Sequence, residues 1–302
     1  MKEKQQYETL PTLTPPRVLG EWSVATLGLL CATGIGTAEP QPDKSQYHLL
    51  NPVPSDLMRE MSTDRPDQTE SPHTVDAGHF QVEMDFVNAT FDRDRSGGAD
   101  VRTSSWGTSL NLKAGLLNNV DIQFVLDPYV NSRLEDRVAG TVDKASGFGD
   151  VQTRLKINLW GNDSGTTAFA VMPFIKWPLA ESSLRNGKTE GGVIFILGCD
   201  LPGGWGSAVM TETDFVSNGL GGYETEFVNS ITFSHEIIGP LGAYVEFFSV
   251  VSTAADSKWQ GQADLGFTFS INKNTALDWG CNFGVTDSAP DFNPFLGLSF
   301  RY

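Results

Sequence analysis

Few residues in this sequence have the types and spacing that catalysis would need. The four histidines are His48, His73, His79 and His235, and His235 directly follows the potential nucleophile Ser234. Neighbouring side chains of an alternating strand point to opposite faces, whereas a nucleophile and its general base must lie within hydrogen-bond reach of each other. We therefore expect no catalytic residue and no enzymatic activity.

Metal binding and phosphate binding are the next chemistries to consider. His73, Asp76 and His79 lie close together in the sequence, but a metal site needs a complete ligand set, and a solvated polar segment accounts for these residues more simply. Glycine pairs such as Gly97-Gly98 and Gly203-Gly204 match no phosphate-binding loop and are typical of turns and strand bends. We expect neither a metal nor another cofactor.

The remaining polar chemistry is a set of charged side chains that recur at every second position between apolar residues. At that spacing they share one face of a β-strand, so we expect them to line the inside of a barrel. They could form a narrow path for cations or small solutes, or they could pair with one another in a closed lumen. The set consists of Glu83, Asp85, Asp121, Arg154, Lys156, Glu224, Glu226, Glu246, Asp264, Asp278 and Arg301.

The elements that must position these charges are strands with a period of two. In the final stretch, Leu296, Leu298, Phe300 and Tyr302 share one face, which is the pattern of a half-buried strand. An open final strand would promote aggregation, whereas pairing with the first strand would remove the edge. Twelve such strands are predicted, at 79–91, 101–115, 120–130, 150–160, 166–177, 190–201, 206–217, 223–237, 242–253, 258–271, 275–285 and 293–302.

The links between these strands alternate in length. Links such as 116–119 and 272–274 are short and rich in Asn, whereas links such as 92–100 and 132–149 are longer and polar. Short periplasmic turns and longer extracellular loops are typical of a transmembrane antiparallel up-and-down β-barrel. The predicted fold class is therefore all-β, with about twelve strands. No run of 18 or more apolar residues follows residue 40, so the sequence predicts no membrane-spanning helix there.

The composition excludes one class of partner. The chain of 302 residues has a formal net charge of -16, and a nucleic-acid-binding protein would need a basic face. This charge is compatible with a barrel, because the lumen and the loops can hold it. We therefore expect no nucleic acid as a partner.

The sequence before the barrel divides into two parts. Residues 1–38 contain an apolar centre and end in the small residues Gly36, Thr37 and Ala38, which predicts a signal or targeting segment cleaved after Ala38. Residues 39–78 are rich in Pro and Asp and have little periodicity, which predicts an irregular periplasmic lead. The barrel is expected to occupy residues 79–302.

One motif in the lead resembles a known family. Residues 78–83 follow this motif and begin the first strand; the motif itself consists of Ser62, Thr63, Asp64, Arg65, Pro66, Asp67, Thr69, Glu70, Ser71 and Pro72. Together they resemble the hallmark of the outer-membrane family called "putative MetA-pathway of phenol degradation". The resemblance extends over residues 62–302 and implies a transporter-like β-barrel in the bacterial outer membrane. No substrate-binding residue can be carried over from it.

These patterns predict a passive channel or uptake porin for small molecules, aromatic or hydrophobic ones included. The alternatives are a closed structural or surface-interaction barrel and, third, a membrane-barrel hydrolase. The expected partners are outer-membrane lipid, an unidentified small solute, and the barrel-assembly machinery, because the terminal aromatic strand resembles an outer-membrane insertion signal. We also expect Arg65 to contact a carboxylate near the short-turn end, and the channel to prefer cations.

Overall fold

The computed structural model of this chain describes residues 42–302, apart from 185 and 256. The predicted signal segment, residues 1–38, lies outside the described residues. The described part contains a short 3-10 helix, Ser96–Gly98, and thirteen strands: β1 Phe80–Asp94, β2 Val101–Leu117, β3 Val120–Asp136, β4 Thr141–Gly147, β5 Val151–Trp160, β6 Thr167–Trp177, β7 Glu190–Leu201, β8 Trp205–Ser217, β9 Tyr223–Ile238, β10 Leu241–Ser252, β11 Gln260–Asn272, β12 Thr275–Gly284 and β13 Phe292–Arg301.

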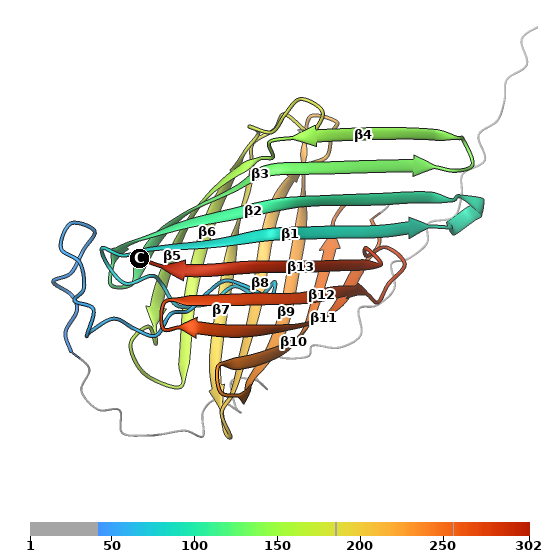
Figure 1. Cartoon of the computed structure of the whole chain (residues 1–302). Coiled ribbons are helices and arrows are strands. Elements are labelled where there is room, and N and C mark those ends of the chain that lie inside the picture. The colour runs from blue at the N-terminus through green and yellow to red at the C-terminus, as the bar shows by residue number, and fades with distance from the viewer. Residues whose placement is uncertain (1–41, 185, 256) are drawn as a thin grey trace, which may run out of the picture.

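The strands form one antiparallel sheet that closes on itself (Figure 1). The first strand, β1, pairs with both β2 and the last strand, β13. Strand β3 pairs with β2 on one side and with β4 and β5 in succession on the other. Because β4 and β5 share one position in the ring, the structure is a closed barrel of twelve strand positions, which confirms the predicted fold class.

Alternation along each strand separates the two faces as predicted. In β12, for example, Asp278 is 2% exposed and points inward, whereas the neighbouring Trp279 is 38% exposed and lies on the outer face. Aromatic contacts occur near both ends of the outer face. Trp106 and Tyr129 lie 5.1 Å apart between ring centroids near the long-loop end, and Trp205 lies 4.7 Å from the His235 ring near the short turns. Two such belts are typical of a barrel that spans a membrane.

The prediction of a loop at residues 132–149 was wrong, because most of this range is strand. Strand β3 continues to Asp136, and β4 pairs with it from Val130↔Gly147 to Asp136↔Thr141. The polar residues of this hairpin lie beyond the aromatic belt, where both faces contact water. Hydrophobic alternation is therefore lost, although the backbone still pairs. In Figure 1, β1 to β4 extend beyond the other strands at this end.

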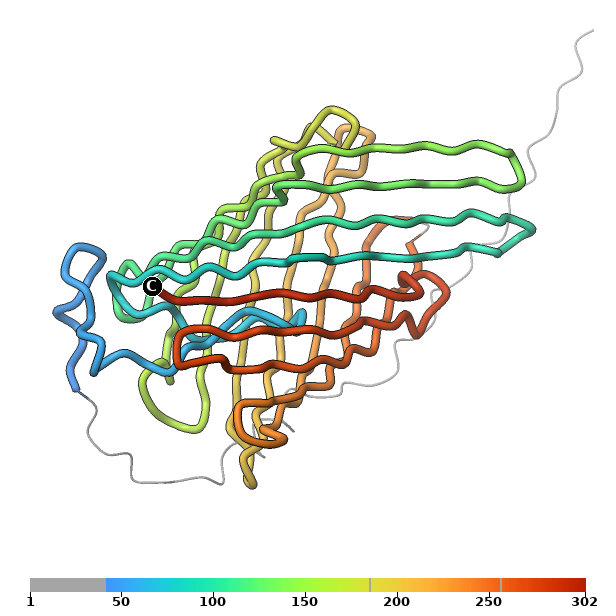
Figure 2. The backbone as a smooth tube through the Cα atoms, in the orientation of Figure 1, coloured from blue at the N-terminus to red at the C-terminus, as the bar shows by residue number. Residues whose placement is uncertain are grey.

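The chain that precedes β1 lies at the end of the barrel that also holds the C-terminus (Figure 2). It is tied there by bonds from His79 Nε2 to the Val53 carbonyl, 2.7 Å, and from the Val53 amide to the Ala77 carbonyl, 3.0 Å. From this end part of it runs among the strands. Within residues 42–302 as described, no helix is long and apolar enough to cross a membrane.

Candidate functional site

The family-like motif lies inside the barrel, and we call residues 62–72 the inner segment. Asp64 is 8% exposed and Thr69 is 2% exposed. The segment has no regular secondary structure, so its polar backbone groups must find partners elsewhere. The inward-facing side chains of the strands provide many of them.

Asp64 is the most enclosed charge of the inner segment. Its carboxylate forms ion pairs with Lys113 of β2 and Lys156 of β5, and its backbone amide donates to Glu83 Oε2 at 3.1 Å. Lys113 also pairs with Glu83. Burial opposes ionisation of Asp64, but the charges of Lys113 and Lys156 outweigh it and hold its pKa well below the ordinary value. Asp64 therefore remains an anion between two cations.

Arg65 bridges two carboxylates on the opposite side. Its guanidinium lies 2.6 Å from Asp85 of β1 and 2.6 Å from Asp278 of β12. Both acids pair in register with Gly297 of β13. A Cβ at Gly297 would lie 2.2 Å from Arg65 Nη2, so the missing side chain leaves room for the guanidinium. The prediction that Arg65 contacts a carboxylate is confirmed.

The tip of the inner segment is held by one wall acid. Glu246 of β10 accepts hydrogen bonds from the backbone amides of Gln68, at 2.8 Å, and Thr69, at 2.7 Å. The Thr69 hydroxyl also lies 2.6 Å from Ser230 Oγ of β9. The Gln68 side chain donates to Asp264 of β11 at 2.8 Å. The buried Glu246 thus accepts hydrogen bonds from the main-chain amides at the tip of the segment.

The last residues of the segment contact β5 and β8. Glu70 forms an ion pair of 2.5 Å with Arg154, and its amide lies 3.5 Å from the Met210 sulfur. Asn158 donates to the Pro72 carbonyl at 2.9 Å. The segment therefore contacts strands on all sides of the lumen.

A second charged group ties the preceding and following chain to the short-turn end. Asp76, which is 1% exposed, lies 3.3 Å from Arg301, 3.4 Å from Arg59 and 3.6 Å from Lys44. Asp121 of β3 accepts a bond of 3.0 Å from the Val75 amide. The segment is thereby anchored at its base as well as along its length.

Most of the predicted inward charges thus contact the chain before β1. Glu83, Asp85, Asp121, Arg154, Lys156, Glu246, Asp264, Asp278 and Arg301 do so through the bonds above. Glu224 and Glu226 lie instead near the start of β9, towards the long loops and level with Val216 and Asp214 of β8. Sequence reasoning did not select Lys113 or Gly297, although Lys113 has the inward spacing.

Sequence reasoning also missed an apolar part of the interior. Six buried side chains form one cluster, with Phe174, Phe248 and Val250 packed against it: Ala170, Met172, Ile194, Ile196, Met210 and Val228. They come from β6, β7, β8 and β9. The signal was present, since β6 and β7 are apolar at successive positions. Such runs do not show which face is inward.

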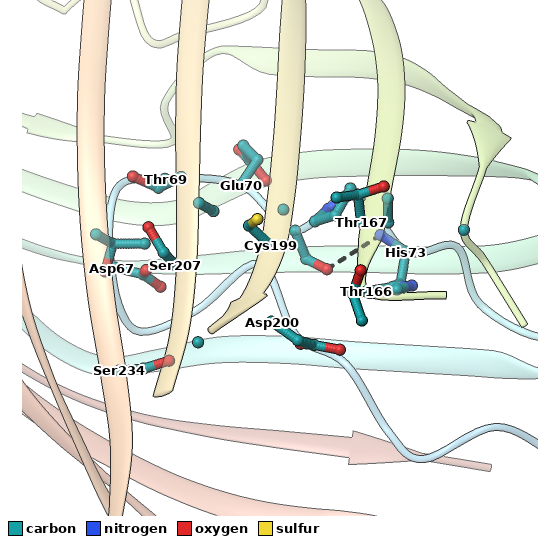
Figure 3. A pocket seen from close by; sticks show the side chains of 18 of the residues that line it. Asp67, Thr69, Glu70, His73, Thr166, Thr167, Cys199, Asp200, Ser207 and Ser234 are labelled. Atoms are coloured by element: carbon teal, nitrogen blue, oxygen red, sulfur yellow. Dashed lines mark hydrogen bonds between the residues drawn. The ribbon is translucent and has the colours of Figure 1, made fainter. Parts of the chain in front are cut away.

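Cavities flank the inner segment on the side of β6 to β10. One of about 200 Å³ separates it from β6 to β9 and is lined by Asp67, His73, Ser207 and Ser234, among others (Figure 3). A second of about 510 Å³ lies beside Arg65 and Asp67 against β9 to β11. A third of about 950 Å³ lies at the short-turn end. The lumen beside the segment is therefore incompletely filled.

Two titratable groups line these spaces, Asp67 of the inner segment and His73, which follows it. Burial raises the pKa of Asp67 to about 7, with the charges of Asp64 and Asp264 acting in the same direction. Burial lowers the pKa of His73 below its ordinary value, and nearby Arg59 adds to this effect. Both groups favour their neutral forms inside the barrel.

The side chains considered for other chemistry have other partners. Asp76 is occupied by basic side chains, and His79 bonds the Val53 carbonyl. Within the described residues, no group of three or more His, Cys, Asp or Glu is arranged to hold a metal ion. His235 stacks on Trp205 and lies 2.9 Å from the Gly204 carbonyl, while Ser234 lines the cavities.

Comparison with known proteins gives one family and several similar folds. The profile of the family described as "Putative MetA-pathway of phenol degradation" matches residues 63–302. An outer membrane channel from Pseudomonas putida F1 superposes with a TM-score of 0.60 at 10% identity, covering 80% of this chain and 100% of the channel. The translocator domain of autotransporter NalP from Neisseria meningitidis gives 0.46 at 10% identity, covering 74% and 88%.

A third similar structure, the porin NanC, gives a TM-score of 0.48 at 11% identity, covering 71% of this chain and 98% of the porin. No curated protein sequence matches. At these identities the similarity concerns the fold alone. Of the three structures named, the Pseudomonas channel has a TM-score above 0.5 and supports the shared fold. The Pseudomonas protein is an outer membrane channel, and this chain has the same barrel fold.

Proposed function

Because the chain belongs to the "Putative MetA-pathway of phenol degradation" family and is an outer-membrane barrel, we propose that it is a passive channel for small molecules. In this proposal the inner segment, which contacts strands on several sides of the lumen, restricts the path. Transport then requires this segment to move, either by release from the wall or by a smaller shift that widens the cavities beside it. Barrels of eight strands are filled by their own side chains and those of sixteen are open, so twelve strands leave room for an internal closure.

The observation that carries the proposal is the polar character of the contact between segment and wall. Asp64, Arg65 and Glu70 are held by ion pairs with strand residues. A charged wall can be rehydrated when the segment leaves, because water replaces each partner. A close-packed apolar plug would expose hydrocarbon instead, at about 25 cal/mol per Å². The closure therefore suits a reversible gate better than a permanent core.

The interior also supports the choice of solute. One side of the lumen is charged, and the cluster from Ala170 to Val228 makes another side apolar. A small molecule with an apolar body and a polar group would match both walls, and this includes aromatic molecules that carry a hydroxyl or carboxyl group.

A membrane-barrel hydrolase receives no support from side-chain geometry. Ser234 and His235 are neighbours on one strand and point to opposite faces, with His235 on the outer face beside Trp205. We therefore propose no enzymatic activity. We further propose that the barrel-assembly machinery recognises β13 and the aromatic Tyr302 that directly follows it.

The test is ion conductance and solute uptake of the folded barrel. Wild type and a variant lacking residues 62–72 are each reconstituted in planar bilayers and in liposomes for swelling assays. Folding is verified by the different gel mobility of boiled and unboiled samples. We expect small, infrequent currents from the wild type and larger, sustained ones from the deletion. If both folded proteins fail to conduct, the closed structural barrel is correct.

A further inference from the structure

The four strands that extend beyond the aromatic belt carry a second feature, on their outer face. Register places Arg93 of β1 opposite Arg102 of β2, and Arg133 of β3 opposite Lys144 of β4. Directly paired residues of antiparallel strands share one face of the sheet. Arg102 shares its face with the exposed Trp106, because the two lie an even number of residues apart along β2. All four basic side chains therefore point away from the lumen.

The inner face of the same extension has the opposite charge. It carries Asp92 and Asp94 on β1, Asp136 on β3 and Asp143 on β4, each one residue from an outward position. The outer face also carries one acid, Glu135, opposite Arg102, but the four basic residues outnumber it. The acidic side faces the entrance of the barrel, and the basic side faces its surroundings.

The basic outer face is only partly neutralised. Arg93 binds Asp100 through two bonds of 2.8 Å, and Arg133 lies 3.1 Å from Glu135. Arg102 and Lys144 are exposed, and within the residues that the structure describes neither lies at ion-pair distance from a carboxylate. Two cationic groups thus remain available on this face.

The height of this basic face above the membrane is fixed by the aromatic belt. Phe91 precedes Arg93 by two residues on β1 and is 48% exposed, and Trp106 and Tyr129 contact each other nearby. Two residues of a strand span about 7 Å, so the basic groups lie just beyond the apolar zone, at the level of lipid head groups. A cavity of about 350 Å³ lies here. It is lined by Phe91 and the basic residues Arg93, Arg102 and Arg133, and also by the acids Asp92, Glu135 and Asp291.

From this arrangement we propose that the basic outer face of β1 to β4 is a binding site for the phosphate groups of lipopolysaccharide in the outer leaflet. The long loops of an outer-membrane barrel face outward, so the lipid beside this extension is that phosphorylated glycolipid. Guanidinium groups suit phosphate because of their planar, forked donors, and the neighbouring aromatic residues would contact the upper acyl chains. This inference depends on the location in the outer membrane and not on the channel function.

The experiment compares the R102Q/K144Q variant with wild type. The full mature proteins, purified in detergent, are titrated with bisphosphorylated lipid A, and bound lipid is counted by native mass spectrometry. The matched control is K188Q/K273Q, which removes two exposed lysines elsewhere. We expect R102Q/K144Q to bind lipid A at least about ten-fold more weakly, because it loses charge-assisted contacts, and the control to bind like wild type.

Two further measurements distinguish binding of the phosphate groups of lipid A from binding of free phosphate. Lipid A from which both phosphates have been removed should bind wild type as weakly as lipid A binds the variant. Millimolar inorganic phosphate should not displace lipid A from wild type. The proposal is overturned if R102Q/K144Q, folded by its gel mobility, binds like wild type, if dephosphorylated lipid A binds equally well, or if inorganic phosphate alone competes fully.

Discussion

Replacing Arg65 should open the barrel, because this residue neutralises two carboxylates that the barrel wall buries. Asp85 and Asp278 have side chains that are 4% and 2% exposed, and Arg65 lies 2.6 Å from each. In R65Q, both acids lose their counter-charge while the segment still covers them. Breaking a buried ion pair by removing one partner costs about 3–5 kcal/mol. If the acids regain water when the segment leaves, R65Q shifts the docking equilibrium by roughly two to four orders of magnitude.

The assay is the open probability of single channels in a planar bilayer. R65Q should be open for a much larger fraction of time than wild type, and proteolysis within residues 62–72 should become faster. R95Q is the matched control, because Arg95 is exposed in the loop between β1 and β2. It should behave like wild type.

A rescue variant separates this explanation from a general loosening of the barrel. R65Q/D85N/D278N removes the stranded charges together with the arginine, and replacing both partners of a buried pair can be nearly neutral. It should therefore close again. If the triple variant is as open as R65Q, or if folded R65Q gates like wild type, the ion pairs do not hold the segment in place.

Three further outcomes are expected. Burial raises the pKa of both Asp67 and Glu70 to about 7; each acid therefore binds its proton more tightly when docked, so docking weakens as pH rises through about 7. In an H73N background, which removes the opposing histidine, open probability should increase from pH 5 to pH 8. D67N should make this dependence weaker, and D67N/E70Q weaker still, because both acids contribute to it. G297V places a side chain where Arg65 lies and should raise open probability at constant pH. Reversal potentials in a KCl gradient should show cation preference, because acids outnumber bases among the predicted lumen residues; anion selectivity would refute that charge assignment.

The sequence predicted the barrel well because period-two alternation arises directly from the contrast between lipid and lumen. Where that contrast ends, the prediction failed. Residues 132–147 form a paired hairpin, but both of its faces contact water, so nothing in the residue types distinguishes it from a loop. Hydrogen bonds of the backbone, which the sequence does not show, hold it together.

The sequence indicated the type of contact that the inner segment makes, but not which residues are its partners. The charges of the motif and of the inward faces indicated ion pairs, and Arg65 does contact carboxylates. Its partner Asp278 lies 213 residues away in the sequence, and the pair forms only because closure brings β12, β13 and β1 side by side. Gly297 matters for the same reason, since it stands between Asp85 and Asp278 in register.

The bonds around the inner segment are distributed unequally, and this determines where a path would open. Ion pairs join the segment to β1, β2, β5 and β12. In the described chain, none joins it to β6, β7 or β8. Towards those strands, its contacts are the Glu70 amide on Met210 and the approach of Pro72 to Gly198, and the cavity of about 200 Å³ lies there. A small displacement towards the charged wall keeps the ion pairs and widens the gap beside the apolar wall. Full release would instead break every ion pair at once, so a solute with an apolar face has the less costly route.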